Sequence, residues 1–338
     1  MDKRFVASAR PIIPILFFLL LIINSLAYSD TEISDDSIKS SKEWFEKGTS
    51  LSHSGKYHDA IEAFNKAIQL NPRNAQAYND RGIIYESQQQ YDKAIDDFNS
   101  AIELDPKDPV FCSNRGVAYA YKQQYANAIE DFTRAIELNV RYADAYNNRG
   151  NVYMTLQQYD KAIVDHTRAI ELNPKDATTY TNRGASYLLK QQHERAIEDF
   201  NEAIEMDPKF IEAYNNRGLA YGQKGQHERA IEDLTRAISL NPRFADAYNN
   251  RGTVYSETYL YDRSLEDFNK AIELNPGDAI VYYNEACVYS LMGKTEEACR
   301  FLKQSIKKES ADWNHIKFNK DLENIRDSSC YKEIMSGR

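Results

Sequence analysis

The sequence predicts an all-α protein, a right-handed α-solenoid (superhelix) of antiparallel helix pairs. Three observations support this prediction: glycine recurs with a period of 34 residues, alanine follows almost every glycine at two fixed distances, and proline closes almost every period. The recurring glycines are Gly48, Gly82, Gly116, Gly150, Gly184, Gly218 and Gly252, and the next step reaches Ala286. Repeats of this length are typical of stacked architectures, in which each repeat contacts only its neighbours.

The composition is that of a folded, acidic protein. Of the 338 residues, 42% are hydrophobic, which is enough to bury a core, and the formal net charge is −9. The first 27 residues carry a net charge of +2, so the rest of the chain carries −11. Because phosphate would repel such a chain, we do not expect nucleic acid as a partner.

The first 27 residues have the layout of a secretory signal peptide. Three basic residues come first: Lys3, Arg4 and Arg10. An apolar run, Pro11–Ile23, follows, and the small residues Ser25 and Ala27 predict cleavage after Ala27. The run is shorter than the ~20 residues that span a bilayer. We therefore expect an exported protein, periplasmic or secreted; the alternative is a membrane anchor formed by an uncleaved N-terminal segment.

One period, Ala145–Pro174, shows the physics of the repeat. Its first half carries one apolar helical stripe, formed by Tyr146, Gly150 and Tyr153. Its second half carries another: Ala162, Ile163, His166, Ala169 and Ile170. Gly150 and Ala162 lack bulk, so the two helices can approach closely, and Pro174 ends the second one. Because one helix pair cannot cover its own apolar faces, neighbouring pairs must stack.

With an aromatic at position 4, Gly at 8, Tyr at 11, Ala at 20, Phe at 24, Ala at 27 and Pro at 32, the period resembles the tetratricopeptide repeat. Eight repeats follow a flexible, polar lead-in at residues 28–40, and residues 313–338 form a C-terminal cap. The repeats, numbered 1 to 8, span residues 41–74, 75–108, 109–142, 143–176, 177–210, 211–244, 245–278 and 279–312. The outer repeats depart most from the pattern, as terminal repeats do.

A charge pair recurs in the six inner repeats. Position 7 holds Arg81, Arg115, Arg149, Arg183, Arg217 and Arg251, and position 23 holds Asp97, Asp131, Asp165, Asp199, Asp233 and Asp267. Both residues are replaced in repeat 1 and in repeat 8. Their joint occurrence predicts an ion pair between the two helices of a repeat, although duplication of the repeat would also copy both residues.

We expect no catalytic, metal or cofactor site. The acidic residues follow the repeat and occupy helical faces, and the glycines lie within helices rather than in a phosphate-binding loop. No pair of Cys or His has metal-ligand spacing. Among the histidines, His193 and His227 replace the Tyr of other repeats and are expected to pack as that Tyr does.

The four cysteines divide into two groups. Cys112 replaces the aromatic at position 4 of repeat 3 and is expected to be buried as a thiol. Cys287, Cys299 and Cys330 lie toward the C-terminus, where one disulfide in an oxidising compartment could pin the cap. The sequence does not select a pair, and three unpaired thiols are an equal alternative.

The resemblance implies that the first helix of each repeat lines a concave groove through positions 2, 5, 6, 9, 12 and 13. Asparagine dominates positions 5 and 6: Asn79, Asn114, Asn147, Asn148, Asn182, Asn215, Asn216, Asn249, Asn250 and Asn284. Each amide offers two donors and an acceptor, which suit the backbone of an extended peptide whatever its side chains. The alternative is that these asparagines only support the packing or hydrogen bonding of the array.

These observations predict an exported protein-interaction module that binds an extended peptide or a partner protein in its groove, as an adaptor in a multiprotein assembly. The groove carries six acidic side chains against one basic side chain, Lys42, so a neutral to mildly basic segment is favoured. The basic clamp that some members of the family use for acidic tails is missing. The alternative is a scaffold that uses its convex face or its cap for oligomer contacts; the oligomeric state stays open.

Overall fold

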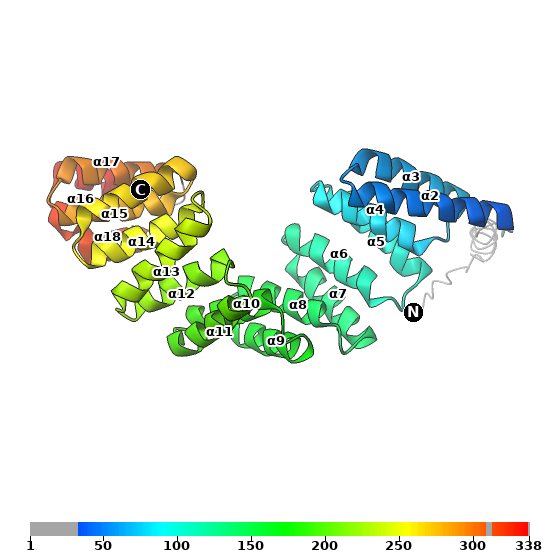
Figure 1. Cartoon of the computed structure of the whole chain (residues 1–338). Coiled ribbons are helices and arrows are strands. Elements are labelled where there is room, and N and C mark those ends of the chain that lie inside the picture. Colours follow the sequence, from blue (N-terminus) through cyan, green and yellow to red (C-terminus); the bar gives the residue numbers. More distant parts are fainter. Residues whose placement is uncertain (1–32, 309–312, 337–338) are drawn as a thin grey trace, which may run out of the picture. The chain divides into compact units, whose positions relative to one another are not determined.

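The computed structural model describes residues 33–308 and 313–336 (Figure 1). The chain divides into an N-terminal body that ends at Ala118 and a C-terminal body that begins at Tyr119. Within the described residues the structure consists of helices, which confirms the predicted all-α class. The predicted signal peptide, with its apolar run, and residues 28–32 of the lead-in lie outside the described residues.

Each repeat forms a pair of helices joined by a short turn. The first helices are α2 (Asp35–His53), α4 (Ala75–Ser87), α6 (Pro109–Tyr121), α8 (Ala143–Thr155), α10 (Ala177–Leu189), α12 (Ile211–Gln223), α14 (Ala245–Glu257) and α16 (Ala279–Leu291). The second helices are α3 (Tyr57–Leu70), α5 (Tyr91–Leu104), α7 (Tyr125–Leu138), α9 (Tyr159–Leu172), α11 (His193–Met206), α13 (His227–Leu240), α15 (Tyr261–Leu274) and α17 (Thr295–Lys308).

Hydrogen bonds of the backbone and of short polar side chains end the helices at the same positions of the repeat. In repeat 4 the first helix closes through two backbone bonds, from Gln158 N to Tyr153 O (2.8 Å) and from Gln157 N to Met154 O (2.9 Å). These bonds need a left-handed residue at position 15, and Gln157 has φ 57° there. At the end of the second helix, position 31 is Asn or Asp in repeats 1 to 7. In six of these repeats its side chain accepts from the backbone two residues on, as from Arg141 N to Asn139 Oδ1 (3.0 Å).

In repeats 1, 2 and 4 to 7 the core of the pair is a close contact between position 8 and position 24. A Cβ added to Gly82 would lie 2.7 Å from the ring of Phe98, and one added to Gly184 would lie 2.7 Å from Phe200. Such approaches are shorter than any van der Waals contact, so only glycine fits. The alanines at positions 20 and 27 are buried as well. Small residues on one helix and a ring on the other thus set the spacing of the pair.

The predicted flexible lead-in is wrong for residues 35–40, because α2 begins at Asp35. Ser34 is the N-cap, and its side chain accepts from Ser37 N (3.2 Å). Asp35 and Asp36 occupy the first turn, where negative charge stabilises a helix. The polar composition of this stretch was the reason for predicting flexibility, but Ser-Asp-Asp is also a typical helix start.

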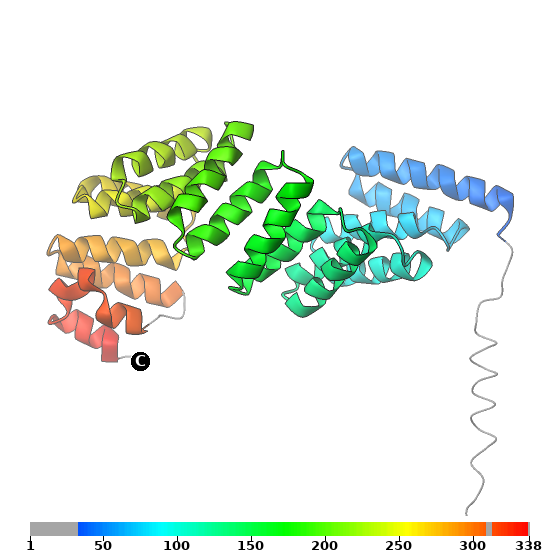
Figure 2. The ribbon, with the colours of Figure 1, turned by 90° about the horizontal axis from the view of Figure 1, so that it is seen from below.

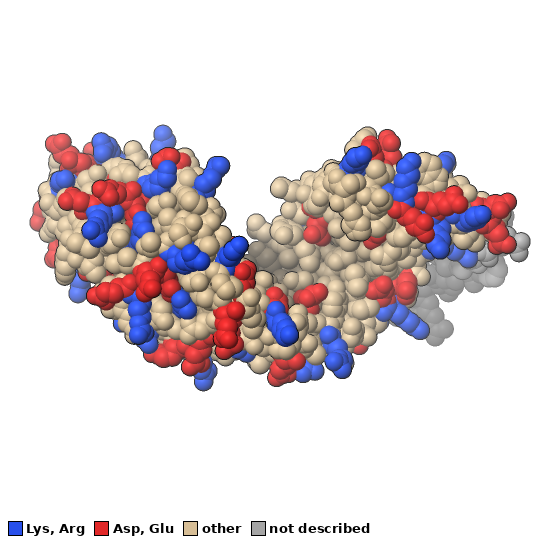
Figure 3. Space-filling view, viewed as in Figure 1, with Lys and Arg blue, Asp and Glu red and all other residues tan. Residues whose placement is uncertain are grey.

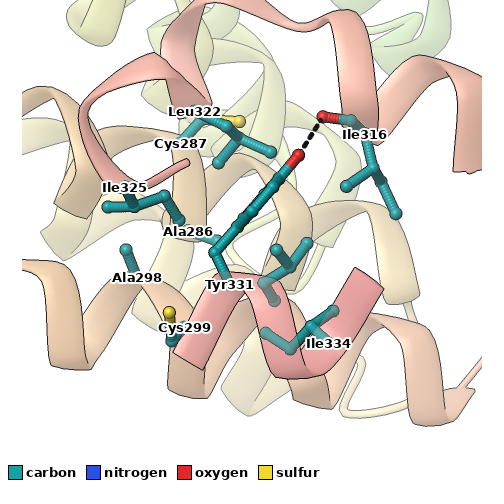
Figure 4. Packing of buried hydrophobic residues seen from close by; sticks show 10 residues of the cluster. Ala286, Cys287, Ala298, Cys299, Ile316, Leu322, Ile325, Tyr331 and Ile334 are labelled. Atoms are coloured by element: carbon teal, nitrogen blue, oxygen red, sulfur yellow. Dashed lines mark hydrogen bonds between the residues drawn. The ribbon is translucent and has the colours of Figure 1, made fainter. Parts of the chain in front are cut away.

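The C-terminal cap consists of α18 (Trp313–Phe318), the 3-10 helix η1 (Lys320–Ile325) and α19 (Ser329–Ser336). Figure 2 shows this segment against the last helix pair. Leu322, Ile325 and Tyr331 of the cap bury themselves against Ala286 and Leu302 (Figure 4). The Tyr331 hydroxyl also donates to the backbone oxygen of Ile316 (3.1 Å). The cap therefore covers the apolar face that a ninth repeat would otherwise bury.

A disulfide joins the last repeat to the cap. It links Cys299 in α17 to Cys330 in α19, so it settles the pairing that the sequence left open. Cys287 stays a buried thiol, and burial raises its pKa to about 12. Cys112 is buried at position 4 of repeat 3, as predicted.

Candidate peptide-binding face

Asn79 and Asn114 lie on α4 and α6 of the N-terminal body, and the other eight predicted asparagines lie on the first helices α8 to α16 of the C-terminal body. In each body we call the surface that carries them the Asn face. Asn79 and Asn215 are buried, and the other eight are half-buried. A half-buried amide keeps access to solvent and to a ligand while its backbone is fixed by the helix. The geometry within each body then shows which amides are already engaged.

Four asparagine pairs connect neighbouring repeats. In each, the amide at position 6 donates to the amide oxygen at position 5 of the repeat before it. The pairs are Asn114 to Asn79 (2.8 Å), Asn182 to Asn147 (3.1 Å), Asn250 to Asn215 (2.9 Å) and Asn284 to Asn249 (3.0 Å). Asparagine therefore has a structural role in this array, as the alternative reading of the sequence held. Each pair uses one donor and one acceptor and leaves further capacity on both amides.

Two asparagines are less engaged. Asn148 makes no side-chain hydrogen bond within the C-terminal body. Asn216 only accepts, from Asn215 Nδ2 (3.2 Å), so both of its own N–H groups are unused there. The reason lies at position 5 of the repeat before Asn216, where Thr181 replaces Asn and donates to its own helix at Ala177 O (3.0 Å). Within the C-terminal body these two amides have both side-chain N–H groups unused, which makes them the least engaged of the Asn face.

Carboxylates flank the amides on the same helices. In the N-terminal body, burial raises the pKa of Glu86 to about 7. Burial also raises the pKa of Asp80, against hydrogen bonds from Asn79 and Gln76 that lower it. In the C-terminal body, burial raises the pKa of Asp246. A cation brought by a partner would stabilise the charged form of each of these groups.

The predicted Arg–Asp ion pairs are confirmed in repeats 2, 4, 5, 6 and 7. In repeats 4 to 7, Nε and Nη2 of the arginine donate to the two carboxylate oxygens at 2.7–2.9 Å. The arginine side chains are 16–19% exposed and the aspartates 6–8%. In repeat 3 the two residues, Arg115 and Asp131, lie in different bodies.

The arginine has further partners that the sequence reasoning missed. Its Nη1 donates to position 25 of the preceding repeat, which is Asn or Thr: Arg115 to Asn99 (2.7 Å), Arg149 to Thr133 (2.9 Å), Arg183 to Thr167 (3.2 Å), Arg217 to Asn201 (2.7 Å) and Arg251 to Thr235 (3.0 Å). The guanidinium also lies over the tyrosines at positions 4 and 11, as in repeat 5 over Tyr180 (5.6 Å) and Tyr187 (6.0 Å). The presence of Asn or Thr at position 25 of repeats 1 to 7 was the available signal.

Repeat 8 replaces this arrangement. Phe301, at the position of the aspartate, stacks on Tyr289 (5.3 Å between ring centroids) and lies near Tyr282 (6.3 Å). Glu285, at the position of the arginine, is fully buried, and burial raises its pKa to about 7. In repeat 1, Lys47 lies over the ring of Trp44 (4.4 Å). The outer repeats thus keep a packed core without the ion pair.

Nothing among the described residues forms a cluster of three or more His, Cys, Asp or Glu side chains with the geometry of a metal site. His193 and His227 are half-buried at the turn-facing start of α11 and α13. Of the helices in residues 33–308 and 313–336, none combines the length and the apolar character needed to cross a bilayer.

Family models of the tetratricopeptide repeat match much of the chain. They cover residues 45–109, 118–157, 143–176, 167–198, 186–225, 211–244, 245–278 and 268–300. None of the curated proteins compared with the sequence matches it significantly. Together the matched segments span more than half of the chain.

Solved structures are similar in fold. A tetratricopeptide repeat protein from Parabacteroides merdae ATCC 43184 matches with a TM-score of 0.59 and 22% identity, over 79% of this chain and 99% of that one. The structure of the APC/C hetero-tetramer Cut9–Hcn1 contains a chain that matches with a TM-score of 0.63 and 18% identity, over 94% of this chain and 58% of that one. These similarities concern the fold alone.

Proposed function

We propose that this chain, which belongs to the tetratricopeptide repeat family, is a protein-interaction module that binds an extended segment of a partner along the Asn face. The observation that carries the proposal is that the asparagines differ in how many of their side-chain hydrogen bonds are already made. Four pairs bond to one another between repeats, while Asn148 and Asn216 keep unused N–H groups on half-buried side chains.

An extended peptide supplies what these amides lack. Its backbone presents carbonyl oxygens and N–H groups at regular intervals, so an asparagine can bind it without reading its side chains. Because the Asn–Asn pairs already hold the neighbouring amides, the side-chain entropy lost on binding comes mainly from Asn148 and Asn216. The paired asparagines support the face, and Asn148 and Asn216 contact the ligand.

Charge on the same helices favours a neutral to mildly basic segment. Asp246 lies in the same body as Asn148 and Asn216 and has no ion pair among the described residues, and burial raises its pKa. A lysine or arginine of the partner would offset that burial, whereas an acidic segment would add repulsion. The module therefore selects against acidic ligands.

Site-specific photo-crosslinking tests the proposal. A photoreactive amino acid replaces Leu189, which is 54% exposed at position 13 of repeat 5, and crosslinked partner peptides are identified by mass spectrometry. The Asn148→Ala/Asn216→Ala variant should lose the crosslinks and keep its unfolding midpoint. The matched variant Asn182→Ala/Asn250→Ala should keep the crosslinks and lose stability, at about 0.5–1.5 kcal/mol for each removed bond.

Equal crosslinking by the parent and by Asn148→Ala/Asn216→Ala would refute the Asn face as the binding surface. The convex face or the cap would then be the place to look, as the scaffold alternative requires. Loss of crosslinks in both variants alike would refute the division between supporting and ligand-binding asparagines.

We further propose that the protein is exported. The layout of residues 1–27 supports this, and so does the Cys299–Cys330 disulfide, since such bonds persist in oxidising compartments. Fractionation of the native host, with N-terminal sequencing of the recovered protein, tests it. A mature N-terminus at Tyr28 in the exported fraction is expected; an intact chain in the cytosol would refute the proposal.

A further inference from the structure

The turn between the two helices of a repeat is polar in seven repeats and apolar in one. Position 15 is otherwise Gly or Gln, and position 16 is otherwise Lys or Gln. Repeat 7 has Tyr259 and Leu260 there, which are 78% and 43% exposed. The turn lies between α14 and α15, both labelled in Figure 1.

Tyr259 occupies this turn against its backbone preference. Its φ is 61°, in the left-handed region, where β-carbon sterics disfavour most residues and glycine is free of them. Repeats 1, 6 and 8 have glycine at this position with φ between 71° and 74°. Repeats 2 to 5 have Gln at this position with φ between 57° and 60°, so the exposed aromatic ring, rather than the backbone conformation, sets repeat 7 apart.

The residue before this turn, at position 14, no longer forms an ion pair in repeat 7. In repeats 5 and 6 a lysine at position 14 pairs with the acid at position 18 of the repeat before it. Lys190 pairs with Asp160 in this way, and Lys224 Nζ lies 2.8 Å from Glu194 Oε1. Repeats 7 and 8 have Thr258 and Met292 at position 14. The corresponding acids, Glu228 and Asp262, are exposed and have no ion pair among the described residues.

The nearby cations are engaged elsewhere. Arg229 lies over the ring of Tyr221 (5.6 Å), and Arg263 lies over Tyr255 (5.8 Å). The ring of Tyr259 lies edge to face with that of Tyr261, at 6.2 Å between centroids, and no cation lies over it within the C-terminal body. Figure 3 shows both signs of charge interspersed on the viewed face of the C-terminal body, so local unpaired groups rather than a large field decide what binds.

We propose that Tyr259, Leu260, Glu228 and Asp262 form a docking surface, the Tyr259 patch, for a partner segment that carries a lysine or arginine beside an apolar side chain. The cation would lie over the exposed ring and pair with the two carboxylates, as Lys224 pairs with Glu194 one repeat earlier. The apolar neighbour would cover Leu260. This surface is separate from the Asn face and does not depend on it.

A defined peptide tests the patch. The probe is a fluorescein-labelled peptide in which arginine alternates with leucine, with two comparison peptides in which glutamate replaces arginine or serine replaces leucine. Binding to the full chain is measured by fluorescence anisotropy, and hydrogen exchange locates the protected segment. We expect the Arg–Leu peptide to bind best and to protect residues 256–262.

The variants copy other repeats, so they keep the fold. Tyr259→Gly/Leu260→Gln reproduces Gly225 and Gln226 of repeat 6 and should weaken binding by at least about tenfold. Thr258→Lys offers Glu228 the lysine that repeat 6 has and should also weaken it. The matched control Gln191→Gly places the same glycine in repeat 5 and should leave binding unchanged.

Three results would overturn the proposal. If the parent and Tyr259→Gly/Leu260→Gln bind the Arg–Leu peptide with equal affinity, the Tyr259 patch is not the binding surface. If the glutamate peptide binds as well as the Arg–Leu peptide, the patch does not prefer a basic segment. Protection of α8 and α12 in place of residues 256–262 would put the peptide on the Asn face, which would support the proposed function and refute the patch. Self-association of the parent that the double variant abolishes would make a second copy the occupant.

Discussion

His166 provides a sharp test of how burial controls this fold. It occupies position 24 of repeat 4, where repeats 2, 5 and 7 have Phe98, Phe200 and Phe268. The ring is fully buried against Gly150, and neither ring nitrogen has a hydrogen-bond partner among the described residues. Burial, with a smaller effect of the Arg183 charge, lowers its pKa from 6.5 to about 4.

The sign of the pH dependence follows from this shift. Below pH 6.5 the unfolded chain binds a proton that the folded chain does not, so stability falls as the pH falls from 6.5 to about 4. A difference of ~2.5 pKa units corresponds to ~3 kcal/mol over that window. Replacing His166 by Phe removes this loss. At pH 7 it also removes an unsatisfied polar group, which gives a further ~1–3 kcal/mol.

Urea unfolding between about pH 4 and 8, followed by circular dichroism, measures both effects. Because long repeat arrays can lose two-state behaviour, hydrogen exchange of α8 and α9 is the second readout. The carboxylates of the chain titrate equally in the parent and in the variant. The difference between their two curves of stability against pH therefore isolates His166. The reciprocal variant Phe200→His should acquire the acid sensitivity. Parallel curves for the parent and His166→Phe would refute the reasoning.

Four other predictions follow from the described contacts. Replacing Arg183 or Asp199 singly by Leu should cost ~3 kcal/mol or more, and a double-mutant cycle should show coupling of at least ~1 kcal/mol; additive effects would mean that the pair is not energetically linked. Cys330→Ser should reduce the stability of the cap by about 3–4 kcal/mol, for a link between cysteines 31 residues apart, with faster hydrogen exchange confined to α18, η1 and α19; unchanged exchange would contradict this. Tyr259→Gly should raise the free energy of unfolding by about 1 kcal/mol, because glycine suits its left-handed backbone, and a lower urea midpoint would argue against strain there. Since burial raises the pKa of Glu86 to about 7, the parent should lose stability on going from pH 4.5 to 7, and Glu86→Gln should abolish this loss, on the order of 1 kcal/mol after allowing for solvent screening; equal pH profiles would exclude it.

The helix pairs were predictable because the sequence repeats the signals that define them. Gly82 and Phe98 recur with the same spacing in most repeats, and each contact lies inside one repeat. The Arg–Asp ion pairs were predictable for the same reason, since Arg183 and Asp199 belong to one helix pair and are kept or replaced together.

Contacts between repeats were harder to predict. Asn182 bonds to Asn147 of the preceding repeat, and Arg183 to Thr167, but a periodic sequence offers many residues at equivalent distances. Only the stacking of the pairs selects among them. The disulfide partner of Cys299 depends in the same way on how the cap folds back, and the cap follows no repeat. The start of α2 was missed because a local capping signal lay within a polar stretch.

The guanidinium at position 7 makes the inner repeats interchangeable with one another. It holds the aspartate of its own repeat and reaches a small polar residue that every preceding inner repeat also supplies. A duplicated or deleted inner repeat therefore brings or removes a complete set of donors and acceptors, and the two new neighbours still match. Arrays of this sequence can grow or shrink by whole repeats during evolution without an intermediate that leaves a buried charge unpaired. Repeats 1 and 8 have Lys47 and Glu285 in place of this arginine, so they cannot be exchanged for an inner repeat in this way.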